Sequence, residues 1–311
     1  MKIGVIGLGN IAQKAYLPSY IALQDQADFY FATRRESVQK ELQQRYRLAH
    51  MYTNLDELID QGIEACFIHT ATGSHYELIK KCLTEGIHVF VDKPVSENFA
   101  EVEELFALAK AKQKLLMVGF NRRFAPMVDQ LKQIPDKRMI YLSKHRQAAS
   151  HDTKYVIYDL FLHLVDTGVY LLDEPIIAHT SQIKESADGL ETATLILETA
   201  HTTAILTMDL KSGANTEDYR ITAKSGTYDV RNLTALTEYV EGKRVEHEFG
   251  DWETTLNKRG FYPLVSAFIA AVADPTAIDL RQAQVIESHQ LCQEMIAPHP
   301  PPPPRQAHSS A

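Results

Sequence analysis

The sequence predicts an α/β protein in which a doubly wound parallel sheet precedes an α+β domain with a large, mostly antiparallel open sheet. Over residues 2–119, short apolar runs alternate with helical stretches, an order typical of a parallel sheet covered by helices on both faces. After Gly119, strand-like segments of alternating polarity follow one another with few helices between them. This second pattern is typical of an antiparallel sheet with one solvent face.

Local composition marks the elements of the first region. The opening run at residues 3–6 is apolar and stops at a glycine, as a buried parallel strand does. Further strands are expected at 29–32, 65–68, 88–91 and 115–118. Helices are expected from about Ile11 and at 37–47, 55–61, 75–85 and 99–112. Asn98 and Glu101 form a capping-box pattern at the start of the last of these helices.

A strand at 138–146 and a helix over 159–172 open the second region. The segments that follow are rich in Thr, Ile, Leu and Tyr, and several of these residue types favour sheets. The strands expected there are 179–185, 192–199, 202–211, 219–223, 227–232, 235–240 and 245–249. Two helices, near 262–273 and 280–296, complete the region.

Composition narrows the class of protein. The 311 residues include 32 basic and 40 acidic side chains, a net charge of -8 with no basic stripe, which argues against a nucleic-acid partner. The three cysteines, Cys66, Cys82 and Cys292, are too few and too scattered for a disulfide framework or a zinc site, and we expect no metal. The chain opens on a strand and holds no apolar run of membrane-spanning length. We therefore expect a cytoplasmic protein with no membrane partner.

The segment from Gly7 to Ala12 has the pattern of a phosphate-binding loop. Gly7 permits a tight turn after the first strand, Gly9 lets the backbone approach a pyrophosphate, and Ala12 replaces a third glycine where alanine is tolerated. The start of the following helix, at Asn10 and Ile11, offers free N–H groups to the phosphates. An ordinary glycine-rich turn is the alternative. The place of this segment at the start of an alternating strand–helix pattern favours dinucleotide binding in a Rossmann domain.

The end of the second strand bears on the choice of cofactor. NAD sites usually place Asp or Glu there to bind the ribose 2′-hydroxyl. This chain has Thr33, Arg34 and Arg35, with no acid until Glu36. Guanidinium groups form forked, charge-assisted hydrogen bonds with phosphate oxygens. The sequence therefore predicts NADP(H) in preference to NAD(H), the alternative being that one arginine is a solvated charge at a helix start.

Three residues suggest a site for proton and hydride chemistry. Lys93 follows a strand that ends at Asp92, so it lies at the edge of the sheet where ligands bind and can donate to a reacting oxygen. Asp159 and His163 are four residues apart on one helix, where a carboxylate can orient an imidazole and raise its pKa. A surface lysine and a structural Asp–His pair are the alternatives. The competing histidines are His145, His151 and His201.

These motifs resemble those of the Gfo/Idh/MocA family, which takes its name from glucose–fructose oxidoreductase, inositol dehydrogenase and a rhizopine-catabolism protein. The resemblance covers nearly the whole chain except the proline-rich end. The matching segments are 3–9, 70–75, 86–94, 119–126 and the helix with Asp159 and His163. Residues 144–146 and 252–261 further resemble an oxidoreductase branch labelled MviM, a label that states no substrate.

The resemblance implies an oxidoreductase that transfers a hydride between nicotinamide C4 and a hydroxyl or carbonyl carbon of a sugar, polyol or related small molecule. His163 would exchange a proton with the substrate, Lys93 would polarise the same oxygen, and Asp159 would orient the pair. Other residues expected at the cofactor are Thr70, Thr72, His75, Asp92, Asn121 and Arg122. Candidates for binding the substrate, with ordinary packing or surface charge as their alternative, are Arg123, Arg146, Tyr155 and Tyr158.

We expect a nucleotide-binding domain over 1–120 and a substrate-binding and oligomerisation domain over 121–297. The resemblance implies that the open sheet joins copies of the chain into a homodimer or homotetramer, and the alternating strands, which leave one broad face to cover, agree with this. The proline-rich residues 298–311 cannot continue a helix, and we expect them to be disordered, the alternative being a docking ligand.

The chain departs from the family pattern at three places. Asp92 stands where the family usually has Glu, Thr70-Ala71-Thr72 replaces Thr-Pro-Asn, and bulky residues 156–158 replace a Gly-Gly pair. The last change suggests a differently shaped substrate pocket. Two other functions remain open, a non-catalytic NADP or metabolite sensor and a nicotinamide-assisted glycosidase. The intact Lys93, Asp159 and His163 favour an enzyme over a sensor.

Overall fold

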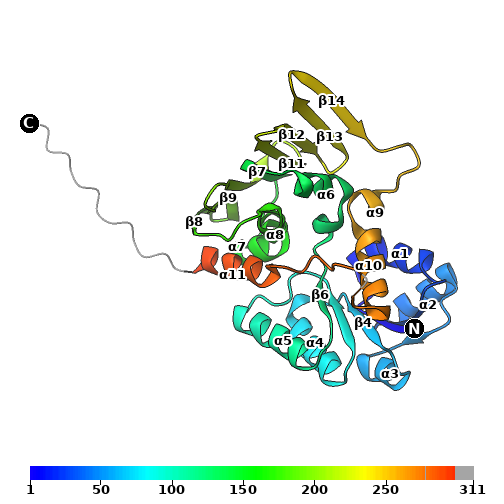
Figure 1. Cartoon of the computed structure of the whole chain (residues 1–311). Helices are drawn as coiled ribbons and strands as arrows, with labels where there is room; N and C mark the ends of the chain where they lie inside the picture. The colour runs from blue at the N-terminus through cyan, green and yellow to red at the C-terminus, as the bar shows by residue number, and fades with distance from the viewer. Residues whose placement is uncertain (277, 298–311) are drawn as a thin grey trace, which may run out of the picture.

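Two β-sheets organise the chain in the computed structural model, which describes residues 1–276 and 278–297 (Figure 1). The first sheet is parallel throughout, with strand order β3-β2-β1-β4-β5-β6. The second has the order β14-β13-β12-β11-β7-β10-β9-β8 and is antiparallel except for the β7–β10 pair. The predicted fold class is confirmed. The prediction made for residues 298–311 lies outside the described residues.

The elements of the first sheet lie close to their predicted positions. Its strands are β1 (Lys2–Ile6), β2 (Asp28–Ala32), β3 (Met51–Tyr52), β4 (Ala65–Ile68), β5 (His88–Val91) and β6 (Leu116–Val118). Its helices are α1 (Leu17–Ala22), α2 (Glu36–Tyr46), α3 (Leu55–Asp60), α4 (His75–Thr84) and α5 (Phe99–Ala111). A π-helical stretch, η1 (Ala12–Tyr16), precedes α1. The sequence analysis did not predict β3, because two residues are too few to show a period.

Each face of the first sheet has its own helices. Side chains of α3, α4 and α5 share a core with Ile6 and Val89 on one face. Side chains of α1 and α2 share a core with Ile3 and Val5 on the other. Every residue of β4 is buried, which explains its continuous apolar run.

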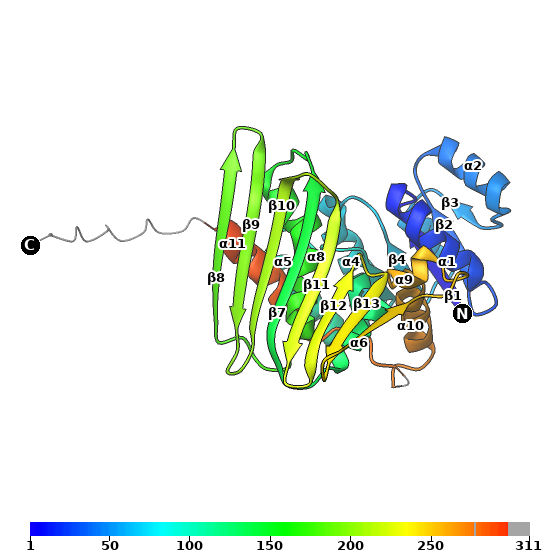
Figure 2. The ribbon, with the colours of Figure 1, turned by 90° about the horizontal axis from the view of Figure 1, so that it is seen from above.

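The second sheet follows the prediction equally closely. Its strands are β7 (Lys137–Gln147), β8 (Ala178–Ser186), β9 (Gly189–Glu198), β10 (Thr203–Ser212), β11 (Thr216–Ala223), β12 (Gly226–Arg231), β13 (Ala235–Val240) and β14 (Lys243–Glu248). Its helices are α6 (Pro126–Gln133), α7 (Thr153–Tyr155), α8 (Leu162–Leu171) and α9 (Thr255–Lys258). Helices cover one broad face of the sheet and leave the other uncovered (Figure 2). On the covered side, Gly168 of α8 lies against Leu206 of β10.

The last two helices bring the chain back to the first sheet. Phe268 of α10 (Phe261–Ala273) packs against Phe67 and Phe90, with ring centroids 5.0 and 5.7 Å apart. Helix α11 (Val285–Ile296) contacts both α5 and α8 (Figure 1). It begins later than predicted because Gln284 has a left-handed backbone conformation, with φ 61°. Helix α10 belongs to the second predicted domain, yet it packs on the first sheet. The boundary between residues 120 and 121 therefore stays a prediction.

None of the helices among the described residues has both the length and the apolar character needed to cross a membrane.

Candidate active site

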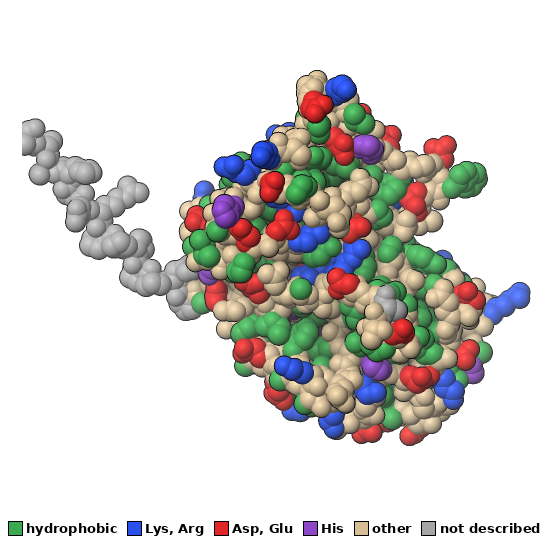
Figure 3. Space-filling model, viewed as in Figure 1, with side chains coloured by type: hydrophobic (Ala, Val, Ile, Leu, Met, Phe, Trp, Pro, Cys, Tyr) green, Lys and Arg blue, Asp and Glu red, His purple; other side chains and the backbone are tan. Residues whose placement is uncertain are grey.

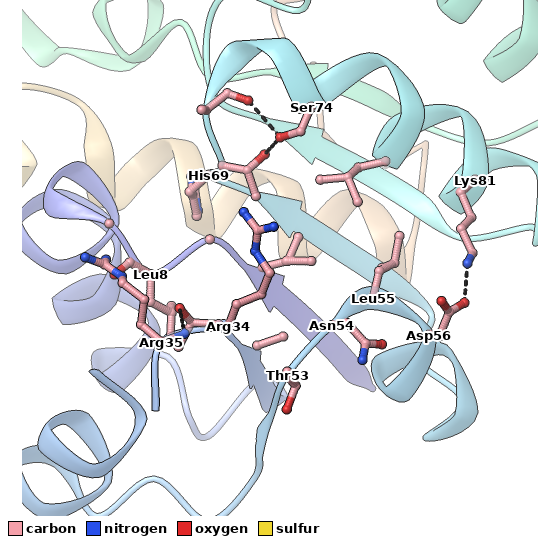
Figure 4. Close-up of a pocket in the computed structure, with 18 of the residues that line it drawn as sticks. Leu8, Arg34, Arg35, Thr53, Asn54, Leu55, Asp56, His69, Ser74 and Lys81 are labelled. Atoms are coloured by element: carbon pink, nitrogen blue, oxygen red, sulfur yellow. Dashed lines mark hydrogen bonds and ion pairs between the residues drawn. The ribbon is translucent and has the colours of Figure 1, made fainter. Parts of the chain in front are cut away.

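A cavity of about 760 Å³ lies at the carboxyl ends of the first strands (Figure 4). It is bounded by the loop after β1, which includes Gly7 and Gly9, and by the loop after β2, which includes Arg34. The loop after β4 adds Thr70 and Ser74. In an open α/β sheet this edge is where ligands bind. The cavity therefore occupies the position that a dinucleotide requires.

The glycine loop is shaped by close contact on one side and open space on the other. Gly7 has φ +95°, and a Cβ there would lie 2.5 Å from the backbone nitrogen of Thr70. Its N–H donates to the carbonyl of Ala32 at 3.1 Å, which fixes the turn after β1. A Cβ at Gly9 would meet no atom within 4 Å. Helical turns begin at Asn10, so backbone N–H groups follow the open side of the loop.

The two arginines after β2 differ in their contacts. Arg35 donates from Nη2 to the carbonyl of Leu8 at 3.2 Å, across the glycine loop. Arg34 is exposed, forms no hydrogen bond or ion pair with another described side chain, and points into the cavity (Figure 4). Thr33 is buried beside them. The carboxylate of Asp56 also lines the cavity, but it is paired with Lys81.

His75 and Asp92 lie beneath the loops instead of lining the cavity. The ring of His75 bridges two backbone carbonyls, with Nδ1 2.8 Å from Pro94 and Nε2 3.0 Å from Thr70. It thereby ties the loop after β4 to the loop that holds Lys93. Asp92 is buried and accepts from the N–H of Lys93 at 2.9 Å. Burial raises the pKa of Asp92, and the nearby charge of Lys93 acts against that rise.

Lys93 pairs with Asp159. Its Nζ lies 2.5 Å from Oδ1 of Asp159 and 2.7 Å from the carbonyl oxygen of the same residue. We expected Asp159 to orient His163, because the two are four residues apart. Asp159 lies in a π-helical stretch, η4 (Val156–Phe161), which precedes α8. A π-helix has more residues per turn than an α-helix, so the four-residue spacing no longer stacks the two side chains.

His163 contacts Arg122. Nη1 of Arg122 lies 3.0 Å from Nδ1 and 3.2 Å from Nε2 of the imidazole. A guanidinium can only donate, so the ring nitrogen that accepts carries no proton. Burial, together with the charges of Arg122 and Lys144, lowers the pKa of His163 well below its ordinary value. We had expected Asp159 to raise this pKa.

Arg122 belongs to a buried network that the sequence analysis did not identify. Its Nε and Nη2 donate to the two carboxylate oxygens of Glu217 at 2.9 and 3.0 Å. The hydroxyl of Tyr219 donates to Glu217 at 2.6 Å, and Nζ of Lys144 lies 3.7 Å from it. Burial alone would raise the pKa of Glu217, but Arg122 and Lys144 hold it well below its usual value.

A signal for this network was present in the strand pattern. Lys144 and Glu217 are paired across β7 and β11. In β7, the alternation that places Ile140 and Leu142 in the core continues to Lys144. A charged residue at an inward position of a strand requires a buried partner, and Glu217 is that partner. The pairing itself was not readable from sequence, because it depends on the register of two distant strands.

Three other polar residues surround Arg122. Asn121 accepts from Nη1 of Arg122 at 3.1 Å and donates to the carbonyl of Arg259 at 2.7 Å. The Arg259 guanidinium lies 3.9 Å from Glu217. Arg146 donates to the carbonyl of His145 at 3.3 Å. Lysine and arginine side chains gather in the hollow between the two halves of the molecule (Figure 3).

The remaining candidates for substrate binding have other surroundings. Arg123 is fully buried in an ion pair with Asp166, at 2.9 and 2.7 Å, and also donates to two backbone carbonyls. Tyr158 is buried in the larger core, and its hydroxyl has no hydrogen-bond partner among the described residues. Tyr155 is 46% exposed, and its pKa is raised by partial burial and by Asp159.

The cavity also differs in part from the predicted set of cofactor residues. Asn10, Ile11 and Thr72 are not among the residues that line it. Polar lining residues that the sequence analysis missed are Thr53, Asn54, Asp56, His69, Ser74 and Lys81. His69 is buried, with Nε2 2.6 Å from the Tyr20 hydroxyl, and burial lowers its pKa to about 3. Asp56 and Lys81 lie in α3 and α4, and the other four lie in the segments that precede these helices. None of these segments carries a phosphate-binding signature.

Comparison with known proteins agrees with this geometry. Residues 1–120 match the Gfo/Idh/MocA family model, described as an oxidoreductase family with an NAD-binding Rossmann fold, and residues 126–241 match the YceM-like C-terminal domain. The chain is 30% identical to YceM of Salmonella typhimurium, named as an oxidoreductase, over 95% of this chain and 97% of that protein. It is 28% identical to myo-inositol 2-dehydrogenase of Thermotoga maritima, over 57% of this chain and 56% of that protein.

A solved structure has the same fold over nearly the whole chain. The dehydrogenase MviM from Clostridium difficile is 29% identical and superposes with a TM-score of 0.88, over 95% of this chain and 98% of that one. The matches cover both sheets and the glycine loop, and the family they identify binds a nicotinamide cofactor. The chain belongs to the Gfo/Idh/MocA family of oxidoreductases.

Proposed function

We propose that this chain is an NADP(H)-dependent oxidoreductase that transfers a hydride between nicotinamide C4 and a hydroxyl or carbonyl carbon of a sugar, polyol or related small molecule. The observation that carries the proposal is the link between the cavity and the Lys93–Asp159 pair. His75 joins Thr70, which lines the cavity, to the loop of Lys93. The similarity to a myo-inositol 2-dehydrogenase supports a polyhydroxylated substrate.

The residues around the cavity fit a dinucleotide. The open side of Gly9 leaves room for a pyrophosphate against the backbone, and the following N–H groups favour its negative charge. Arg34 points into the cavity beside Thr33, which suits a 2′-phosphate. When bound, the nicotinamide ring supplies or accepts the hydride at C4.

The proposed proton acceptor is His163. During oxidation of an alcohol, the neutral imidazole takes the hydroxyl proton while the hydride leaves the adjacent carbon and the C–O bond becomes a carbonyl. Lys93 donates a hydrogen bond to the same oxygen and stabilises its developing negative charge. Asp159 positions the lysine. Arg122 holds the imidazole at rest, and its hydrogen bond to the one unprotonated ring nitrogen is released when that nitrogen takes the substrate proton. In the reverse direction the same groups return the proton.

The uncovered face of the second sheet is the proposed contact between copies of the chain. It carries a hollow of about 530 Å³, lined by Tyr141, Ile205 and Arg220 among others. We infer a homodimer or homotetramer that buries this face.

Sedimentation velocity measures the assembly directly. We expect a sedimentation coefficient for two or four chains at micromolar concentration, and a monomer would contradict the inference.

The two loop glycines should respond differently to an added methyl group. Gly7→Ala places a Cβ against backbone at a positive φ, so we expect it to lower the free energy of unfolding by more than about 1 kcal/mol. Gly9→Ala meets open space and should leave stability within about 0.5 kcal/mol while weakening NADPH binding about tenfold or more. Thermal unfolding and fluorescence titration measure the two effects. Unchanged NADPH affinity in Gly9→Ala would contradict the assigned pyrophosphate site.

Arg34 should determine the preference between the two cofactors. Arg34→Asp removes a donor to the 2′-phosphate and adds a repelling charge, so NADPH affinity should fall about tenfold to a hundredfold. NADH lacks this phosphate, and its affinity should not fall. Arg138 is exposed on β7, outside the cavity, so Arg138→Asp is a charge-matched control. Equal losses for NADPH and NADH in Arg34→Asp would refute the assignment.

His163 should affect turnover more than binding. His163→Ala should reduce kcat by about 10²- to 10⁴-fold, the usual contribution of a general acid–base, with little change in NADPH affinity. Because its pKa is lowered, wild-type His163 stays neutral on acidification past the ordinary histidine range. The acid limb of kcat/KM for alcohol oxidation should therefore lie well below pH 6.5. A variant that keeps its turnover, or a wild-type limb near pH 6.5, would count against this role.

A further inference from the structure

The site between the two halves contains more positive than negative side chains. Its cations are Lys93, Arg122, Lys144, Arg146 and Arg259, and the carboxylates that contact them belong to Asp159 and Glu217. In Figure 3 lysine and arginine side chains gather in this hollow, while most acidic side chains in that view lie farther out. The protein as a whole is acidic, with a net charge of -8, so this local excess runs against its composition.

Both carboxylates are already engaged. Asp159 accepts from Lys93, and Glu217 accepts two hydrogen bonds from Arg122 and one from Tyr219. Lys144 shares Glu217 at 3.7 Å. Burial, with the charge of Arg122 beside it, lowers the pKa of Lys144 well below its usual value. Because Lys144 is buried against Glu217, we leave it out of the count of cations available to a ligand.

Two arginines remain without a carboxylate of their own. Arg146 forms no ion pair with any residue in the described part of the chain, and its hydrogen bond goes to the carbonyl of its neighbour His145. Arg259 reaches only Glu217, at 3.9 Å, and its side chain is 38% exposed. A guanidinium has five N–H donors, so both side chains keep free donors. Partly burying such a charge without a partner is unfavourable.

Both arginines belong to the surroundings of Arg122, which contacts the proposed proton acceptor. Arg146 follows Lys144 by two residues on β7, so the two share one face of the strand. The backbone carbonyl of Arg259 accepts from Asn121, the neighbour of Arg122. Arg146 is one of the cations whose charge lowers the pKa of His163.

The phosphates of the cofactor do not account for this excess charge. None of the five cations is among the residues that line the cavity along the glycine loop. That cavity has its own cation, Arg34, for a 2′-phosphate and backbone N–H groups for the pyrophosphate. The unpaired donors of Arg146 and Arg259 are therefore available to the substrate.

We propose that the substrate is anionic, a sugar or polyol that carries a carboxylate or phosphate group bound by Arg146 and Arg259. The inference rests on the proposed function and names the substrate class for that same site. The anionic group fills donors that are otherwise free, and the hydroxyl or carbonyl to be oxidised or reduced lies toward Lys93 and His163. A neutral sugar or polyol leaves both guanidiniums without an anionic partner.

A matched set of three acyclic compounds tests the proposal. D-glucitol is neutral, D-gluconate carries a carboxylate, and D-glucitol 6-phosphate carries a phosphate on the same six-carbon chain. Each is titrated calorimetrically into the full-length protein saturated with NADPH, at low salt to limit screening. The reduced cofactor cannot accept a hydride from a hydroxyl group, so only binding is measured. We expect at least one charged compound to bind about tenfold or more tightly than D-glucitol.

Three variants assign the preference to residues. Arg146→Gln and Arg259→Gln should each reduce the ratio of charged to neutral affinity at least about threefold, while Arg138→Gln, exposed on the same strand as Arg146, should preserve it. The more tightly bound compound shows whether the group is a carboxylate or a phosphate. Equal affinities for all three compounds, including no measurable binding of any, would overturn the inference, as would a preference that both glutamine variants retain. Failure of wild-type protein to bind NADPH would instead overturn the proposed function.

Discussion

The buried ion pair between Arg122 and Glu217 is the contact on which the rest of the site depends. Arg122 lies in the short helix after the first sheet, and Glu217 lies on β11 of the second. The same guanidinium also donates to Asn121 and contacts the ring of His163. Removing one partner of a buried pair typically costs about 3–5 kcal/mol, because the other charge is left unpaired. One side chain therefore fixes the junction of the sheets and the position of the imidazole together.

This arrangement has two electrostatic consequences. Cations around His163 oppose its protonation, which keeps the ring neutral but makes it a weaker base. The same cations favour negative charge on a nearby oxygen, which is where charge develops when an alcohol loses its proton. Asp159 restrains Lys93 without contributing a carboxylate to the imidazole. The cations thus lower the pKa of a bound alcohol as well as that of the proposed acceptor, and the proton transfer depends on the difference between the two.

The sequence was most informative where burial and local pattern coincide. The runs at 65–68 and 88–91 could be assigned because parallel strands buried on both faces are continuously apolar. The sequence analysis singled out Lys93 and the helix of His163, and the fold places Lys93 against Asp159, which precedes this helix. The four-residue spacing predicted His163 as a partner of Asp159, but a local π-helical stretch changes that spacing. Asp159 pairs instead with Lys93, 66 residues away, which the family resemblance also implied.

The residues that escaped prediction share a physical feature. In β7 and β11, the positions that face inward hold Ile140, Leu142 and Ile221 where they meet the core, but Lys144 and Glu217 where they meet the site. An apolar pair of similar size would serve the fold at least as well, because desolvating two charges offsets most of their attraction. Places where a sequence breaks the pattern of its own element are often functional. The buried charges at the ends of these strands are therefore explained by the chemistry of the site and not by the stability of the sheet.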